Sequence, residues 1–379
     1  MSRMLAVGIL ALSASVATAA LAEPVKVGMI TTLSGGLAGL GIEVRDGFLL
    51  ALKQSGNKDV QLVIEDDNGE PARAVQLAEK VIKADKVDVL TGILYSNLAM
   101  AVVPGVVGQK KFYLSPNAGP SPLAGAKCSP FYFNVSWQND AMHEAMGNYS
   151  NEAGYKKMFI LAPNYPAGTD ALRGFKRYYK GELAGELYTK LGQTDYAAEI
   201  AQIRASGADA VYFFLPGDMS IAFMKQYAQA GVKLPITGPG FSLDQDVLGA
   251  MGDIALGVKN TSQWSEDLDN PANKAFVEGF KAEYKRRPSI YASQGYDTAN
   301  LLLSAVAKAS VKDAAAFRAA LEAADFKSVR GSFRFGLNHH PIQDVYVRDV
   351  VKVDGALTNK LVSKTFTAHQ DAYVKDCKM

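Results

Sequence analysis

Residues 88–120 have the sequence DVLTGILYSNLAMAVVPGVVGQKKFYLSPNAGP, which contains two strand patterns that each end in a polar loop. The first strand, at residues 87–92, precedes an apolar run at 98–107 that predicts a buried helix with Ser96 or Asn97 as its N-cap. The second strand, at 111–114, ends in a loop whose prolines and glycine leave backbone N–H groups without partners.

These two loops predict a binding site for a small polar group. In an open parallel sheet, ligands bind beyond the carboxyl ends of the strands, and a helix N-terminus at that edge favours an anion. We therefore expect this segment to hold a carboxylate or a similar acceptor group. On residue types alone, an ordinary serine-capped connection between helix and strand is an equally good interpretation.

The alternation of strand and helix patterns continues on both sides of this segment. Further strands are predicted at residues 25–30, 60–64, 131–135, 157–162, 208–215 and 235–237. Helices are predicted between them at residues 42–54, 72–84, 140–153, 168–179 and 219–230. Repeated βαβ units form parallel sheets with helices on both faces, and chains above about 250 to 300 residues tend to divide. We therefore predict an α/β protein with two lobes.

The pattern changes after Val258. Residues 260–270 are polar and irregular, which indicates a crossing between lobes, and helices are predicted at 271–287, 290–309 and 311–324. Two antiparallel strands are predicted at 330–335 and 345–351, and the rest of the chain reads as a polar tail that ends near Cys377.

The first 22 residues are typical of a Sec signal peptide. They combine a basic Arg3, an apolar run at 4–14 and an Ala20-Leu21-Ala22 ending, so we predict cleavage before Glu23. A membrane anchor is the alternative interpretation, although Ser13, Ser15 and Thr18 interrupt the segment and it lacks a following basic stop. The net charge of +2 is dispersed, which gives no indication of a nucleic-acid partner.

Export would carry the two cysteines, Cys128 and Cys377, into an oxidising compartment. Their separation is compatible with a disulfide that ties the C-terminal tail to the body of the fold. Two free thiols are the competing interpretation. The pair lacks the C-x-x-C spacing of redox and zinc sites.

Motifs for catalysis, metals and cofactors were not found. The four histidines are His143, His339, His340 and His369, and none has metal-ligand spacing. The glycine-rich residues 31–41 lack both nucleotide-binding patterns, and no G-x-S-x-G elbow occurs. We therefore expect no metal, no cofactor and no enzymatic activity.

Several short motifs together resemble one family. They are the signal peptide, VGMITTLSG at 27–35, EDD at 65–67, YSN at 95–97, LSP at 114–116 and YASQGYDTA at 291–299. In this order they resemble the periplasmic solute-binding proteins of ABC importers, of the branched-chain amino-acid-binding type. The resemblance extends over nearly the whole mature chain.

The resemblance implies two Rossmann-like lobes joined by a three-segment hinge, with a ligand cleft between them. The first lobe would contain residues 23–136 and 265–328, and the second 137–264 and 329–379. It also implies a periplasmic monomer that binds a small molecule and has a membrane ABC permease as its partner.

The resemblance further implies which residues bind the ligand. Ser96 and the loop Asn117-Ala118-Gly119 match the positions that hold the ligand carboxylate in the family, and aromatic residues match the cleft lining. With neighbouring positions added, the expected ligand-binding residues are Leu40, Tyr95, Ser96, Asn97, Asn117, Ala118, Gly119, Gln138, Tyr165 and Phe241.

Two departures from the family pattern bear on the ligand. Amino-acid binders have an acid in the segment that is Gly238-Pro239-Gly240 here, and Gly119 replaces a threonine. A buried ammonium without a carboxylate partner is costly, so an amino acid is disfavoured unless Asp140, Asp218 or Asp244 substitutes.

The sequence instead looks most like binders of aromatic acids such as benzoates or hydroxycinnamates. The expected apolar walls are Tyr95, Trp137, Tyr165, Phe214 and Phe241. The alternatives are a binder of branched-chain amino acids, other amino acids or amides, a sensor module that presents its ligand to a receptor, and a periplasmic enzyme.

Overall fold

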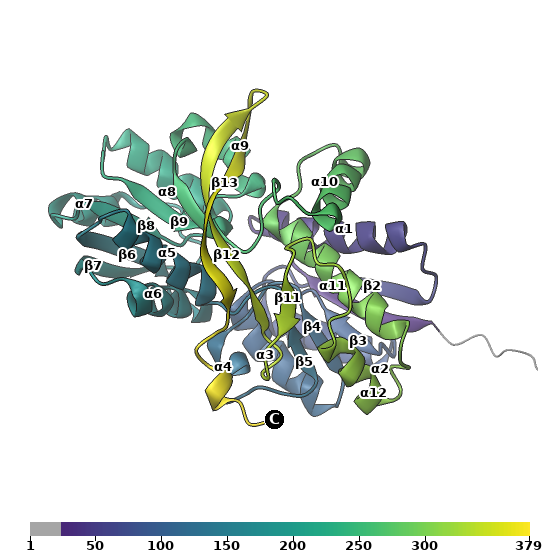
Figure 1. Cartoon of the computed structure of the whole chain (residues 1–379). Coiled ribbons are helices and arrows are strands. Elements are labelled where there is room, and N and C mark those ends of the chain that lie inside the picture. Colours follow the sequence, from purple (N-terminus) through teal and green to yellow (C-terminus); the bar gives the residue numbers. More distant parts are fainter. Residues whose placement is uncertain (1–23) are drawn as a thin grey trace, which may run out of the picture.

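A computed structural model describes residues 24–379, so the predicted signal peptide lies outside the described residues. The predicted α/β fold with two lobes is confirmed: Figure 1 shows two lobes side by side, each built on its own sheet. The long ribbon of β12 and β13 runs between them (Figure 1). No helix within residues 24–379 is both long enough and apolar enough to cross a membrane.

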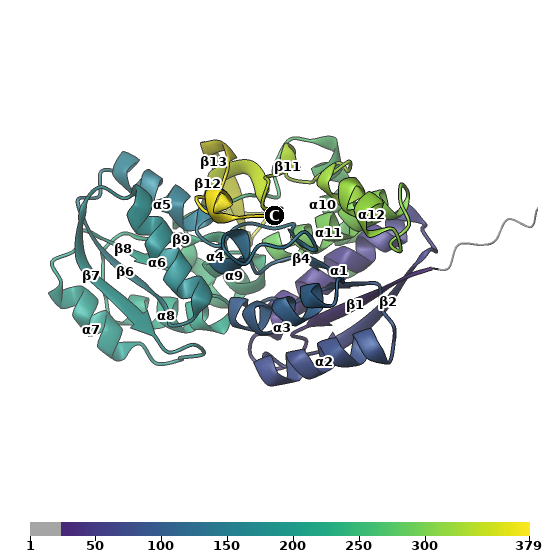
Figure 2. The same cartoon turned by 90° about the horizontal axis from the view of Figure 1, so that it is seen from below.

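The first lobe contains a parallel five-stranded sheet in the order β2-β1-β3-β4-β5. Its strands are β1 (Val25–Thr31), β2 (Val60–Asp66), β3 (Val89–Thr91), β4 (Phe112–Ser115) and β5 (Tyr132–Asn134). Helices α2 (Pro71–Lys83) and α3 (Ser96–Gly108) cover one face (Figure 2). The other face carries α1 (Ala38–Ser55), α10 (Pro271–Tyr284), α11 (Ile290–Val306) and α12 (Ala314–Glu322).

The second sheet has the order β11-β12-β10-β9-β8-β6-β7, with β13 paired to β12. Its parallel strands are β6 (Lys157–Pro163), β7 (Glu182–Thr189), β8 (Ala210–Phe213), β9 (Ile236–Pro239) and β10 (Lys259–Ser262). Its antiparallel strands are β11 (Phe333–Phe335), β12 (Pro341–Val353) and β13 (Ala356–His369).

Alternation along β8 shows why helices cover both faces of this sheet. Tyr212 belongs to the cluster that includes α5 (Ala141–Glu152) and α6 (Pro166–Tyr178). Val211 and Phe213 point the opposite way. They belong to the cluster with α7 (Ala197–Ala205), α8 (Asp218–Gln229) and α9 (Gln245–Met251). A strand that is apolar on both faces needs cover on both.

The chain crosses from one lobe to the other at three places. β5 lies in the first sheet and β6 in the second, while α10, which follows β10, packs against α1 of the first lobe. The chain then returns to the second sheet at β11 and β12. The YASQGYDTA motif lies on α11, where an added Cβ on Gly295 would lie 2.0 Å from the carbonyl oxygen of Val44. The glycine therefore permits the close contact between α1 and α11.

Three sequence predictions were wrong. The polar tail contains the fourteen-residue strand β13, and residues 260–262, predicted as irregular, lie in strand β10, whereas 263–270 are irregular as predicted. Strand β13 is an edge strand, and most of its side chains are exposed. Because few of them are buried, its sequence has little of the apolar alternation that predicts a strand. Helix α3 begins at Ser96, so its N-cap is Tyr95, and no side chain caps it.

Cys128 and Cys377 are joined in a disulfide. The bond connects the tail that follows β13 to the segment between α4 (Ser121–Ala124) and β5. Nearby, the Asn338 side-chain amide donates a hydrogen bond to the Ala124 carbonyl oxygen at 2.9 Å. Parts of the segment 329–379, which the resemblance assigns to the second lobe, thus contact the first.

Candidate ligand-binding site

A pocket lies where the loops that follow the strands of the two sheets face each other. About 390 Å³ of the space between its walls, including the part open to solvent, is free of protein atoms. The first lobe lines it with Leu40, Leu94, Tyr95, Ser96, Asn117, Ala118 and Tyr291. The second lobe lines it with Trp137, Asn139, His143, Tyr165, Ala167, Phe214, Pro216 and Phe241.

Hydrogen-bond donors gather on the first-lobe side of this pocket. Ser96 is the first residue of the thirteen-residue helix α3, so its N–H has no partner within the helix. The N–H groups of Ser96, Asn117 and Ala118 make no hydrogen bond to any other residue in the described chain. The helix N-terminus adds a partial positive charge, so this side of the pocket suits an anion.

The loop after β4 is held rigidly in place. Ser136 Oγ donates to the Asn117 carbonyl oxygen at 2.7 Å, and Ser115 Oγ donates to the Ala118 carbonyl oxygen at 2.7 Å. The N–H and C=O groups of a trans peptide point in opposite directions, so the bond from Ser136 turns the Ala118 N–H away from Ser136. The Asn117 side chain is also fixed, since its Nδ2 donates to the Leu94 carbonyl oxygen at 2.6 Å.

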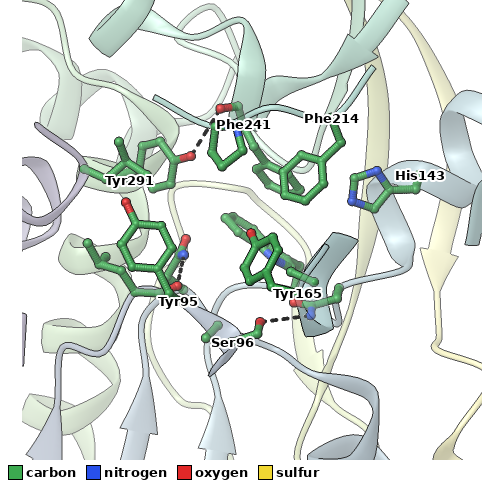
Figure 3. A pocket seen from close by; sticks show the side chains of 15 residues that line it. Tyr95, Ser96, His143, Tyr165, Phe214, Phe241 and Tyr291 are labelled. Atoms are coloured by element: carbon green, nitrogen blue, oxygen red, sulfur yellow. Dashed lines mark hydrogen bonds between the residues drawn. The ribbon is translucent and has the colours of Figure 1, made fainter. Parts of the chain in front are cut away.

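Asn139 connects this loop to helix α3. Its Nδ2 donates to Ser96 Oγ at 3.0 Å and to Asp170 Oδ2 at 2.9 Å, and its Oδ1 accepts from the Gly119 N–H at 3.1 Å. Because Ser96 Oγ accepts the bond from Asn139, its own hydrogen is free to point at a ligand (Figure 3).

Aromatic rings form the second-lobe walls. The ring centroids of Trp137 and Phe241 are 4.2 Å apart, and those of Tyr165 and Phe214 are 6.3 Å apart in a stacked arrangement. Figure 3 shows Phe214, Phe241 and Tyr165 around the same space, opposite Tyr95. Flat walls of this kind suit a planar apolar group.

Two tyrosines complete the lining from the first lobe. Tyr291 Oη donates to the Phe241 carbonyl oxygen at 3.4 Å (Figure 3). Burial raises the pKa of the Tyr95 and Tyr291 hydroxyls well above their ordinary value. Both side chains are therefore neutral and act as hydrogen-bond groups rather than as charges.

No Asp, Glu, Lys or Arg is among the described residues that line the pocket. Asp140 is bonded to Arg177 at 2.9 Å and accepts from Tyr373 Oη at 2.7 Å. Asp244 is bonded to Arg348 at 2.7 Å, and Asp218 is the exposed first residue of α8. The three acids considered as ammonium partners are thus outside the lining, and two are neutralised by arginines.

Seven of the ten expected binding residues line this pocket, namely Leu40, Tyr95, Ser96, Asn117, Ala118, Tyr165 and Phe241. Asn97, Gly119 and Gln138 do not. Gln138 is bonded to Asp140 through both ends of its amide, while the Gly119 N–H is bonded to Asn139. An added Cβ on Gly119 would lie 2.0 Å from the Trp137 carbonyl oxygen, which explains why a threonine does not fit there.

Sequence reasoning did not select Asn139, His143 or Tyr291 for the site. Tyr291 lies in a motif that carried the family resemblance, so that motif was a signal for it. Asn139 and His143 follow the first crossing between the lobes and show no motif of their own. Within residues 24–379, no group of three or more His, Cys, Asp or Glu side chains is arranged to hold a metal ion.

Comparison with known proteins identifies the family. A family model described as periplasmic binding protein matches residues 24–356, so the chain belongs to the periplasmic binding protein family. The Leu/Ile/Val-binding protein homolog 6 of Brucella suis biovar 1 is 29% identical over 393 aligned positions, which cover 98% of this chain and 99% of the relative.

Two similar solved structures are solute-binding proteins of ABC transporters. One, from R. palustris in complex with benzoate, is 32% identical with a TM-score of 0.89 and covers 94% of this chain and 100% of its own. Another, from Rhodopseudomonas palustris BisB5 in complex with 3,4-dihydroxybenzoic acid, is 31% identical with a TM-score of 0.84 and covers 92% and 99%. The family and these neighbours are solute-binding proteins and not enzymes.

Proposed function

We propose that this protein is the periplasmic substrate-binding component of an ABC import system, and that its ligand is a small aromatic carboxylate. The observation that carries the proposal is the pocket itself. It offers unpaired N–H groups and a hydroxyl on one side, aromatic rings on the other, and no charged side chain among its described lining residues. A carboxylate needs such donors, whereas an ammonium group needs an acidic partner.

The ligands of two similar structures also support an aromatic carboxylate. The two R. palustris proteins, at 32% and 31% identity, were solved with benzoate and with 3,4-dihydroxybenzoic acid. The Leu/Ile/Val-binding names of the Brucella relatives favour a branched-chain amino acid as the second candidate. The lack of an acid within Gly238-Pro239-Gly240 and among the described lining residues argues against that candidate.

Binding is proposed to close the two lobes around the ligand. The lobes are residues 23–136 with 265–328, and 137–264 with 329–379, joined by the three-segment hinge. Because lining residues come from both lobes, the ligand makes its full set of contacts only when the lobes are closed. A difference of about 5.5 kcal/mol in affinity between two states moves their ratio from 1:99 to 99:1. The membrane permease would bind the closed form.

Export to the periplasm through a signal peptide cleaved after Ala22, and action as a monomer, are parts of the same proposal. The ligand-binding residues that we propose are Tyr95, Ser96, Asn117, Ala118, Tyr165 and Phe241, with Leu40 as an apolar contact. Asn97, Gly119 and Gln138 are proposed to act by shaping the loops around them.

Calorimetry on the purified mature protein tests the proposal. Benzoate, 4-hydroxybenzoate and 4-hydroxycinnamate are compared with leucine, isoleucine and valine at the same concentration. We expect heat of binding for at least one aromatic acid and weaker binding for the amino acids. A clear preference for leucine would overturn the aromatic assignment, and consumption of the ligand would indicate an enzyme.

A further inference from the structure

His143 is the only histidine among the residues that line the pocket, and it has one ring nitrogen without a partner. Its Nδ1 is hydrogen-bonded to Tyr212 Oη, while Nε2 makes no hydrogen bond to the described chain. Figure 3 shows the Nε2 edge of the ring directed toward Tyr165 and Phe214, that is, into the pocket. Tyr212 therefore fixes the ring so that its free nitrogen faces the ligand.

The surroundings of this imidazole are aromatic. Its ring centroid is 5.0 Å from that of Phe214 and 5.7 Å from that of Phe241. Burial lowers the pKa of His143 to about 3, so the ring is neutral in any ordinary buffer. Because Nε2 faces the pocket and has no protein partner, a ligand group that supplies a hydrogen bond to it gains affinity.

We infer that His143 recognises a hydroxyl group on the ring of the bound aromatic carboxylate, which makes it a specificity-determining residue. The inference rests on the proposed function and adds the class of substituent that the ligand carries. A hydroxyl both donates and accepts, so it pairs with Nε2 in either tautomer of the imidazole. The ligand carboxylate already has donors in the first lobe, at Ser96 and Ala118.

In this arrangement the two ends of the ligand contact different lobes, the carboxylate the first lobe and the hydroxyl the second. Ser96 and the Ala118 N–H belong to the first lobe, whereas His143 lies on α5 of the second. A ligand held only by its carboxylate has its polar contacts on one lobe. A hydroxylated ligand has polar contacts on both lobes, and these are complete only in the closed form, so the hydroxyl favours closure.

The test compares matched ligands on the wild type and on His143→Phe, which keeps an aromatic ring and removes the nitrogens. The ligands are benzoate, 3-hydroxybenzoate, 4-hydroxybenzoate and 4-methylbenzoate, the last being a control for size. We expect the wild type to bind one hydroxybenzoate about tenfold more tightly than benzoate, and we expect His143→Phe to lose that preference because its affinity falls more for the hydroxybenzoate than for benzoate.

Two further variants separate a contact with the ligand from a structural effect. Tyr212→Phe removes the partner of Nδ1, so it should reduce the preference for hydroxybenzoate and leave benzoate binding unchanged. His369→Phe is the control, since this histidine lies against Glu144 and Phe366 and does not line the pocket. It should leave both affinities unchanged.

If His143→Phe fails to fold, ¹⁵N NMR of the wild type gives the same information. The Nε2 resonance of His143 should shift on addition of hydroxybenzoate and stay in place with benzoate. Equal affinities for benzoate and all hydroxybenzoates, equal losses for both in the variant, or no differential shift would overturn this inference alone. Absence of binding by all four ligands and by 4-hydroxycinnamate would overturn the proposed function as well.

Discussion

The side-chain nitrogen of Asn139 lies 3.0 Å from the hydroxyl oxygen of Ser96. The two residues are separated by 43 positions in the chain, and the first crossing between the lobes lies between them. Asn139 also binds the Gly119 N–H and Asp170, so one amide positions both loops that carry the donors of the pocket. The orientation of the Ser96 hydroxyl depends on this amide.

Replacing Ser96 by alanine should weaken binding of an aromatic carboxylate by about 1–3 kcal/mol, because a hydrogen bond to a charged group is lost. Isothermal calorimetry with benzoate or 4-hydroxybenzoate measures the change. Ser304→Ala is a matched control, since Ser304 donates to the Leu301 carbonyl oxygen within α11 and does not line the pocket. Equal affinities for the Ser96 variant and the wild type would exclude the hydroxyl from the site.

Replacing Asn139 by leucine should reduce both binding and stability. The change removes three hydrogen bonds and leaves the Gly119 N–H buried without a partner, so we expect a loss of about 2 kcal/mol or more in unfolding free energy. Urea denaturation and calorimetry measure the two effects. Asn148→Leu serves as the control, because Asn148 lies on α5, the helix that follows Asn139, and does not line the pocket.

Gly119→Ala should destabilise the protein by about 1–3 kcal/mol, since the new Cβ would overlap the Trp137 carbonyl oxygen and the Asn134 side chain. Gly105→Ala is the opposite case. Gly105 lies on α3 with no atom within 4 Å of an added Cβ, so alanine should stabilise by about 0.5–1 kcal/mol there. Thermal unfolding of both variants checks the contrast, which fails if Gly119→Ala unfolds like the wild type.

Stability should depend on pH through His143. The folded pKa of about 3 is below the unfolded value near 6.5, so the unfolded state binds more protons between these values. The contribution of this residue is therefore full above pH 6.5 and decreases as pH falls toward 3, by at most about 1.4 kcal/mol per pH unit. Urea unfolding at pH 7, 6 and 5 should show a smaller decrease for His143→Phe than for the wild type. Identical decreases would contradict this.

Removing the disulfide should lower stability. Cys128→Ser with Cys377→Ser opens a link between residues 249 positions apart, and such links typically stabilise by about 2–4 kcal/mol. Reduction of the wild type should give the same decrease in melting temperature, whereas the double variant should not respond to reductant. A wild type that melts at the same temperature with and without reductant would show that the bond contributes nothing.

The fold could be predicted from the sequence because each strand and helix is marked by a pattern within its own residues. Strands such as β8 are buried on both faces and keep an apolar run, and the helices between them keep apolar residues at helical spacing. Strand β13 was not predicted for the opposite reason. Most of its side chains are exposed, so its sequence does not need alternating apolar residues.

The pocket was only partly predictable. Ser96 and Asn117 could be selected because they follow strands at the carboxyl edge of a sheet, a relationship that a single lobe defines. Asn139 and His143 face the same space only because the second lobe folds over the first. No spacing along the chain encodes that arrangement, so the residues contributed by the second lobe needed the structure.

The link between Cys128 and Cys377 also has a consequence for biosynthesis. Its second partner is made 249 residues after the first, so the bond forms only once nearly all of the chain has been synthesised. A polypeptide that is cut short before Cys377 keeps Cys128 as a free thiol. Labelling with an alkylating reagent therefore distinguishes fully translated molecules from truncated ones in a cell extract.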